Sequence, residues 1–253
     1  TVGRAAFSGR GWRTGSVENA AFYGLQLVSA EKISRKAKQA DKEKNAKNTG
    51  RHRVNHMEPR IATVNRVTKE TDISLTLNLD GSGQCSIDTG IGFFNHMLNG
   101  FARHGLFDLT IKCRGDLEVD SHHTVEDCGI VLGEAIRQAA GEKKAIKRYG
   151  SAILPMDEAL MLCAVDLSGR PYLVFDVSYT VPMLGDMQTE LFHEFFYAVS
   201  YAGAMNLHLK MFSGVNNHHI AESSFKAFGK ALDMATMYEE RLNGAVWSTK
   251  GVL

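Results

Sequence analysis

The sequence predicts a fold made of two copies of one unit, and each unit combines strands with helices. Three observations support this prediction. Segments that alternate apolar and polar residues, typical of half-buried strands, are followed by segments with the apolar spacing of a helix. The same order of elements occurs in residues 57–150 and again in residues 151–253. A motif with paired histidines also lies at the same place in each copy, which makes chance a poor explanation and indicates internal duplication.

In the first copy, residues 73–79 alternate as a strand, and Asp80-Gly-Ser-Gly83 is a turn signal that predicts a hairpin with a short strand at 84–88. Phe94, Leu98 and Phe101 then show helical spacing. The remaining expected elements of this copy are a helix over 91–104, a strand over 108–114, and a helix over 122–140 that Ser121 caps.

The second copy repeats this order. Two strands, 159–167 and 172–178, are expected around the turn Ser168-Gly-Arg-Pro171. A helix over 189–204, a strand over 207–211 and a long helix over 218–239 follow. A polar tail, which begins at Trp247, ends the sequence.

Composition and charge argue against several classes of function. The 253 residues are 44% hydrophobic, enough for a sizeable core, and their net charge of +1 argues against nucleic acid as a partner. No apolar run reaches the roughly 18 residues that a membrane span needs. The four cysteines are scattered without a CxxC pair, so we expect free thiols in the cytoplasm rather than a cysteine zinc site.

Residues 1–56 differ from the rest of the chain. Between Lys32 and Arg53 there are nine basic residues and only two acidic ones. Such a segment buries too little apolar surface to offset the entropy lost on folding. We therefore expect residues 1–56 to be a flexible basic leader, and a transit peptide is an alternative that its arginine content suggests. The compact part is expected to start at Met57.

The histidines carry the strongest chemical signal. His122-His123-Thr-Val-Glu126 is echoed by His218-His219-Ile-Ala-Glu222, 96 positions later. His96 and His193 precede these motifs by 26 and 25 positions. Within each motif the glutamate lies four residues after the first histidine and three after the second, so each pair can share a helix face. The two histidines themselves point about 100° apart.

This geometry fits one histidine and the glutamate on one ion, with the other histidine reaching a different ion. Six histidines and two glutamates could thus hold two metal ions and leave coordination positions open for a substrate, as in catalytic sites. Nitrogen and oxygen ligands suit Mn²⁺, Fe²⁺ or Zn²⁺. The competing interpretation, polar residues at the exposed starts of two helices, explains one motif but not two in matched positions.

A second signal is a set of cations that could form a phosphate cradle. Lys226 follows Glu222 by one helical turn and should project on the same side. The other candidates are Arg148 at the junction of the copies, Arg170 on a turn, and Ser248 and Lys250 in the tail. Each of these, taken alone, is more often a solvated surface group.

From Arg66 to the end, the chain closely resembles the imidazoleglycerol-phosphate dehydratase family. The resemblance covers about three quarters of the sequence, and its motifs are specific. The stretches that carry it are Arg66–Thr71, Asp88–Met97, Asp120–Asp127, Asp166–Pro171, Asn217–Glu222 and Ser248–Gly251.

The resemblance implies an α+β fold in which each half is a four-stranded sheet with helices packed on one face. It also implies a hydro-lyase of histidine biosynthesis that converts D-erythro-imidazole glycerol phosphate to imidazole acetol phosphate. The family's active site holds two Mn²⁺ ions that bind the substrate imidazole. The family forms homo-oligomers of 24 subunits with active sites between subunits, and a cytoplasmic location is expected.

By motif match, the resemblance assigns a role to each candidate residue. The implied metal ligands are His96, His122, His123, Glu126, His193, His218, His219 and Glu222. The implied substrate contacts are Glu70, His96, Arg148, Arg170, Lys226, Ser248 and Lys250. Glu70 is the acid/base candidate, and Glu126 and Glu222 are the other carboxylates at the catalytic centre.

Two other functions compete with this one. A dinuclear metal hydrolase would use the open coordination positions to activate water. A metal-storage or structural shell would use the His/Glu sites only to join subunits, and would leave the cations without a purpose.

Overall fold

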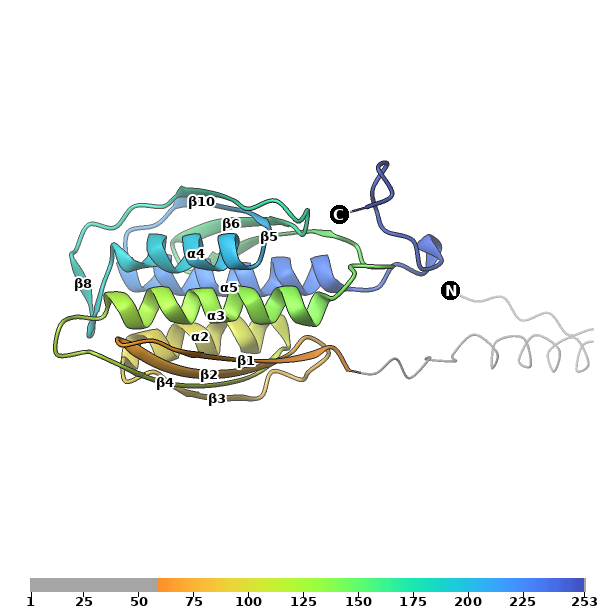
Figure 1. Cartoon of the computed structure of the whole chain (residues 1–253). Coiled ribbons are helices and arrows are strands. Elements are labelled where there is room, and N and C mark those ends of the chain that lie inside the picture. Colours follow the sequence, from red (N-terminus) through yellow and green to blue (C-terminus); the bar gives the residue numbers. More distant parts are fainter. Residues whose placement is uncertain (1–58, 253) are drawn as a thin grey trace, which may run out of the picture. The chain divides into compact units, whose positions relative to one another are not determined.

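Four α-helices lie between two four-stranded sheets in residues 59–252, the part of the chain that the computed structural model describes (Figure 1). Helices α2 and α3 pack on the first sheet, and α4 and α5 pack on the second. The predicted fold, two four-stranded sheets each covered by helices on one face, is therefore confirmed. The predicted leader over residues 1–56 and the proposed start at Met57 lie outside the described residues.

The two sheets have the same topology. The first has the order β1-β2-β4-β3 and the second β5-β6-β10-β7, with the third strand of each copy parallel to its neighbour and the other pairs antiparallel. The first sheet consists of β1 (Ile61–Val67), β2 (Thr71–Asn78), β3 (Cys85–Asp88) and β4 (Asp108–Gly115). The second consists of β5 (Tyr149–Met156), β6 (Ala159–Asp166), β7 (Tyr172–Asp176) and β10 (Asn206–Ser213). A small hairpin, β8 (Met183–Leu184) with β9 (Met187–Gln188), precedes α4.

The predicted hairpin at residues 80–83 is wrong, because β4 lies between β2 and β3. Strand β4 pairs with β2 along its whole length, whereas the short β3 could offer only a few ladder hydrogen bonds. The turn itself is held by Asp108, whose carboxylate accepts hydrogen bonds from the N–H groups of Ser82 (2.8 Å) and Gln84 (3.0 Å). In the second sheet, β10 separates β6 from β7 in the same way.

Strands β1 and β5 were not among the expected elements. Both are edge strands, and both carry large hydrophobic residues on the exposed face, such as Ile61, Val67 and Ile153. Strand β5 also contains Gly150 and Pro155. Apolar residues on both faces hide the alternation that identifies a half-buried strand.

The helices agree with the predicted spans to within a few residues: α2 is Gly92–Gly105, α3 is His122–Ala140, α4 is Leu191–Ala202 and α5 is Asn217–Thr236. A short 3-10 helix, Glu240–Leu242, follows α5. The predicted cap by Ser121 is wrong: Asp120 Oδ1 accepts from the N–H of His122 (2.7 Å), while Ser121 Oγ donates to Gln188 Oε1 (2.9 Å). Asn216 caps α5 by accepting from the N–H of His218 (2.9 Å).

Each helix of the first half packs on a helix of the second half: α2 packs on α5, and α3 packs on α4. Gly229 permits the first of these contacts, because a Cβ atom there would lie 2.3 Å from the carbonyl oxygen of Phe101. The rings of Phe101 and Phe228 stack beside it with centroids 5.0 Å apart. This close approach also brings the N-terminal turns of α2 and α5, which carry the histidines, next to each other.

We expect Gly229→Ala to lower the free energy of unfolding by about 1–3 kcal/mol, because the added methyl group must push α2 and α5 apart. The matched control is Gly100→Ala on α2, whose Cβ would meet only Lys226 Cγ at an ordinary 3.8 Å. That change should raise stability by up to about 1 kcal/mol, since alanine is the better helix former. Urea unfolding of both variants checks the sign; equal shifts would contradict the close-packing argument.

No helix within residues 59–252 has both the length and the apolar character required to cross a membrane.

Candidate metal centre and active site

His96, His218 and Glu222 meet where α2 packs on α5. The Nε2 atoms of His96 and His218 lie 3.4 and 3.1 Å from the same carboxylate oxygen, Oε2 of Glu222. One donor atom from each of the three residues lies within 4.8 Å of the others. Two imidazole nitrogens and one carboxylate oxygen form a ligand set that suits Mn²⁺, Fe²⁺ or Zn²⁺, so the residues present fit a divalent metal ion.

Lys226 holds the second oxygen of Glu222. Its Nζ lies 2.8 Å from Oε1, and the Glu222 side chain is only 11% exposed. Burial alone would raise the pKa of Glu222, but the ammonium group of Lys226 and the nearby His96 outweigh it, and the pKa is lowered. Glu222 is therefore held in its charged form, with Oε2 directed at the two imidazoles.

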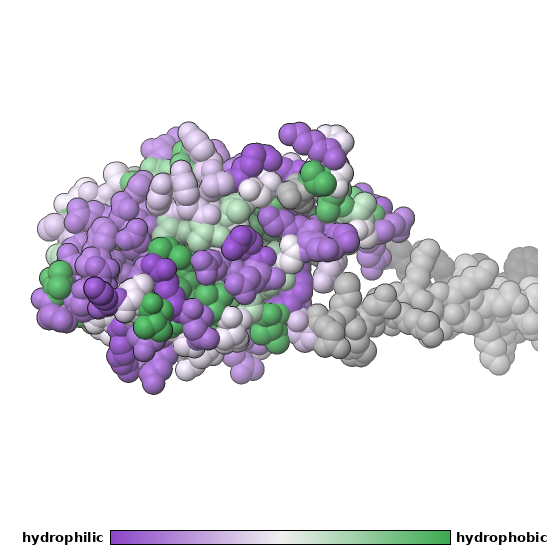
Figure 2. Space-filling view, in the orientation of Figure 1, coloured by the Kyte–Doolittle hydropathy of each residue, from purple (hydrophilic) through white to green (hydrophobic). Residues whose placement is uncertain are grey.

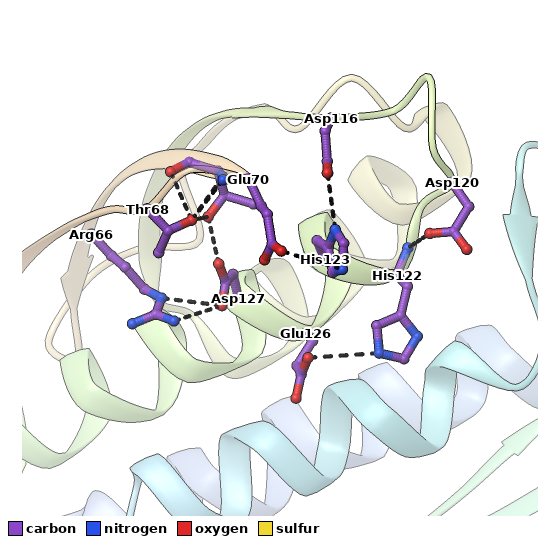
Figure 3. A network of polar contacts seen from close by, with 10 residues as sticks. Arg66, Thr68, Glu70, Asp116, Asp120, His122, His123, Glu126 and Asp127 are labelled. Carbon is purple, nitrogen blue, oxygen red and sulfur yellow. Dashed lines mark hydrogen bonds and ion pairs between the residues drawn. The ribbon is translucent and has the colours of Figure 1, made fainter.

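The corresponding residues of the first half are less closely gathered. His122 Nε2 lies 3.6 Å from Glu126 Oε2, and the Glu126 side chain is 41% exposed (Figure 3). His193, the repeat counterpart of His96, places its Nδ1 2.9 Å from Glu194 Oε1 and stacks on Tyr197. Among the described residues of one chain, the three-residue metal group thus forms around Glu222 and not around Glu126.

The second histidine of each pair contacts a carboxylate from another element, although its spacing of three residues would let it share a helix face with its own glutamate. His123 Nδ1 lies 3.0 Å from Asp116 Oδ2, and His219 Nδ1 lies 2.7 Å from Glu158 Oε2. These carboxylate contacts raise the pKa values of both imidazoles. The other ring nitrogen, Nε2, makes no hydrogen bond among the described residues, and a turn carboxylate lies near it: Glu70 Oε1 is 3.9 Å from His123 Nε2, and Asp157 Oδ2 is 3.8 Å from His219 Nε2.

Glu70 sits on the turn between β1 and β2, with Oε1 3.9 Å from His123 Nε2 (Figure 3). The buried Asp127 on α3 fixes this turn. It accepts hydrogen bonds from Arg66 Nε (3.1 Å) and from Thr71 Oγ1. The Glu70 carboxylate is therefore exposed beside a histidine on a turn that is itself anchored to the helix.

The candidate phosphate ligands lie in several places. Arg148 is buried in a two-bond contact with Asp166 (2.7 and 3.1 Å) and donates from Nη1 to the carbonyl oxygen of Trp247 (2.7 Å). The Asp166 carboxylate raises the pKa of Arg148. The bond to Trp247 ties the tail, with Ser248 and Lys250, to the start of β5. Among residues 59–252, no hydrogen bond or ion pair joins this group to the histidines of α2 and α5.

A cleft of about 610 Å³ opens beside the group around Glu222. Its lining includes two cations, Arg103 and Lys226, and one carboxylate, Glu222. Burial, together with the charges of Lys226 and Lys230, lowers the pKa of the lining His104, which favours its neutral form. The positive charge of the cleft therefore comes from the two cations, which outnumber the carboxylate and favour an anionic ligand.

Sequence reasoning missed three residues of this region: Asp116, Glu158 and Arg103. A signal for Glu158 exists, because it directly precedes β6 just as Glu70 directly precedes β2 at the same place in the first sheet. Asp116 and Arg103 belong to no paired motif, and only the folded chain shows what they contact.

Comparisons with known proteins agree with this geometry. Residues 89–232 match the family model described as imidazoleglycerol-phosphate dehydratase. The imidazoleglycerol-phosphate dehydratase of Acetivibrio thermocellus is 62% identical over 190 residues, which cover 75% of this chain and 97% of the relative. That of Lachnoclostridium phytofermentans is 62% identical over 194 residues, covering 77% and 98%.

Two solved structures are also similar. The imidazoleglycerol-phosphate dehydratase of Pyrococcus furiosus superposes with a TM-score of 0.65 at 39% identity, covering 75% of this chain and 100% of the other. The enzyme of Staphylococcus aureus gives a TM-score of 0.64 at 38% identity, covering 70% and 99%.

Proposed function

The chain belongs to the imidazoleglycerol-phosphate dehydratase family, a family of hydro-lyases of histidine biosynthesis, and from this premise we propose its substrate, metal and site. The substrate is D-erythro-imidazole glycerol phosphate and the product imidazole acetol phosphate. The observation that carries this proposal is the His96–His218–Glu222 group beside a cationic cleft. The metal group suits the imidazole end of the substrate, and the basic residues suit its phosphate end.

Two Mn²⁺ ions complete each active site in this proposal. His96, His218 and Glu222 would supply ligands to one ion, and His122, Glu126 and His193, which hold the matching repeat positions, to the other. His123 and His219 would add one Nε2 each, since Nδ1 of each ring already holds a carboxylate. Bound divalent ions supply Lewis-acid chemistry, drawing electron density from the substrate imidazole.

The chain's own residues move the proton. The reaction removes the hydroxyl group from the carbon attached to the ring and a proton from the next carbon, and the enol so formed becomes the ketone. Glu70 is the carboxylate that we assign to this proton transfer. Its support is its position: an exposed carboxylate 3.9 Å from His123 Nε2 on an anchored turn.

The phosphate group is held by Lys226 together with Arg148, Arg170, Ser248 and Lys250. The family motifs that contain Arg170, Ser248 and Lys250 support the assignment, as does the hydrogen bond that joins the tail to Arg148. Arg148 acts here by fixing the tail: Asp166 holds its Nε and Nη2, and its Nη1 donates to the carbonyl oxygen of Trp247.

We expect Lys250→Ala to raise KM by roughly tenfold or more, because one charge-assisted hydrogen bond to phosphate is lost. The Mn²⁺ content per subunit should stay unchanged, because Lys250 contacts no candidate metal ligand among the described residues. Steady-state kinetics and metal analysis of one preparation check both values. A loss of metal with an unchanged KM would overturn the cradle assignment.

We also propose that the protein forms a homo-oligomer of 24 subunits with its active sites between subunits. Two observations support assembly. Among the described residues of a single chain, neither His193 nor the cations of the tail belong to the metal group around Glu222. The outer face of the second sheet exposes large hydrophobic residues, including Tyr149, Ile153 and Tyr172. On the face drawn in Figure 2, by comparison, hydrophobic residues form separate groups among hydrophilic ones.

The test is an assay of the purified full chain with D-erythro-imidazole glycerol phosphate, before and after chelation and with Mn²⁺ restored. Formation of imidazole acetol phosphate that is lost on chelation and regained with Mn²⁺ supports the proposal. Hydrolysis of esters or amides without dehydration would favour a metal hydrolase. Metal-dependent assembly without turnover would favour a structural shell. Sedimentation of the same samples tests the 24 subunits, and the cytoplasmic location stays a prediction.

A further inference from the structure

We infer that Glu158 is a positioning residue, which fixes the ring of His219 so that Nε2 faces the metal centre. The inference rests on the proposed function, because it treats His219 as a metal ligand. Neither the repeated motif nor the family resemblance pointed to Glu158. It emerges from the contacts between the β5–β6 turn and the start of α5.

The two carboxylate oxygens of Glu158 have separate partners on α5. Oε2 accepts from His219 Nδ1 at 2.7 Å, and Oε1 accepts from the N–H of Asn216 at 2.7 Å. Because an ionised carboxylate can only accept, Nδ1 must carry the proton and Nε2 presents its lone pair. Such outer carboxylates commonly set the tautomer of a metal-binding histidine.

Comparison with the first half shows that duplicated turns have diverged. Glu70 and Glu158 each directly precede the second strand of their sheet. Glu158 contacts Nδ1 of its histidine, behind the metal-binding atom, whereas Glu70 lies 3.9 Å from Nε2 of His123, in front of it. One turn glutamate is thus placed to hold a ligand and the other to reach a substrate.

Two further contacts explain how the first half can use its turn glutamate differently. Asp116, which follows β4, takes over the contact with His123 Nδ1 at 3.0 Å. The Arg66–Asp127 contact anchors the β1–β2 turn without using Glu70. In the second half, Ser223 holds the repeat position of Asp127 and bonds within its own helix, and Glu158 links the β5–β6 turn to the start of α5. Both halves therefore place a carboxylate on Nδ1, but from different elements.

Glu158→Gln tests the inference. The amide oxygen can still accept from Asn216 N–H, while the amide nitrogen faces His219 Nδ1 and donates to it. The imidazole proton then moves to Nε2, the atom that would bind the metal. We expect Mn²⁺ affinity at one of the two sites to fall about 10- to 100-fold, the usual effect of an outer-shell partner. Titration of the metal-free full-length protein with Mn²⁺, followed by the EPR signal of the free ion, measures this directly.

Glu134→Gln is the control, since it removes one carboxylate from α3 that makes no hydrogen bond or ion pair among the described residues and belongs to no candidate metal group. Its Mn²⁺ affinity should stay within about twofold of the parent protein. In a His219→Ala background, Glu158→Gln should cost nothing further, because Glu158 acts through His219. Glu158→Asp keeps a charged acceptor and should retain more Mn²⁺ affinity than Glu158→Gln. It replaces Glu158→Gln as the test variant if Glu158→Gln does not fold.

Unchanged Mn²⁺ affinity in Glu158→Gln, or an equal loss in Glu134→Gln, would overturn the inference. The readout is separate from the proposed reaction: a parent protein that binds two Mn²⁺ ions but does not dehydrate the substrate would refute the function and leave the role of Glu158 standing. A parent protein that binds no Mn²⁺ would refute both the metal site and the positioning role.

Discussion

Glu70→Gln is expected to lower kcat by about 10²- to 10⁴-fold, the usual contribution of a general acid or base. Glutamine has nearly the shape of glutamate but cannot take up a proton at neutral pH. The β1–β2 turn should keep its structure, because Thr68, Thr71 and Asp127 hold it through contacts that do not use the Glu70 side chain. KM and Mn²⁺ content should therefore change little.

The matched control for Glu70 is Glu118→Gln, which removes a charge from another exposed carboxylate, in the loop before α3. Its kcat should stay close to that of the parent protein. Steady-state kinetics, together with metal analysis, separate a lost proton transfer from a lost metal. If turnover of Glu70→Gln were unchanged, Glu70 would have no part in the mechanism. If turnover fell only together with Mn²⁺ content, Glu70 would act on the metal centre instead.

Glu222→Gln should cause the largest loss of metal affinity. The change replaces the charged oxygen that His96 and His218 both approach, and it leaves the Lys226 ammonium without its carboxylate 2.8 Å away. An unpaired cation beside the site would also repel a divalent ion. We expect Mn²⁺ affinity to fall by more than the roughly 10- to 100-fold typical of outer-shell partners, and kcat/KM to fall with it.

Glu134→Gln on α3 is the control for Glu222, because it removes a helical carboxylate that belongs to no candidate metal group. Mn²⁺ titration and kcat/KM at saturating metal should distinguish the two variants. If high Mn²⁺ concentration restored Glu222→Gln fully, the residue would serve metal binding alone. If Mn²⁺ affinity were unchanged, Glu222 would not be a ligand, and the assignment of the centre would fail.

Local pattern was sufficient for the helices of this protein but not for the pairing of its strands. The span predicted for α3, from His122 to Ala140, agrees with the structure because apolar residues at helical spacing face one core. Strand neighbours are set instead by contacts between distant segments. Nothing in the sequence near Asp80–Gly83 indicates that β4 pairs with β2. The turn was therefore predicted correctly, but the pairing of the strands on either side of it was not.

The candidate site divides in the same way. The matched motifs around His122 and His218 identified Glu126 and Glu222, because side chains four residues apart on a helix share a face whatever the helix packs against. The partners of these residues come from elsewhere: Asp116 follows β4, and Glu158 precedes β6.

The sequence by itself determined the duplication, the secondary structure of most of the chain and the ligand types of a metal centre. All three depend on periodicity and spacing within short segments. Only the tertiary structure decided that His96 joins His218 rather than His122, because α2 packs on the helix of the opposite half. It also decided which of two equivalent turn glutamates lies near Nε2 of its histidine and which holds Nδ1. That choice depends on distances of a few ångströms between segments that are far apart in the chain.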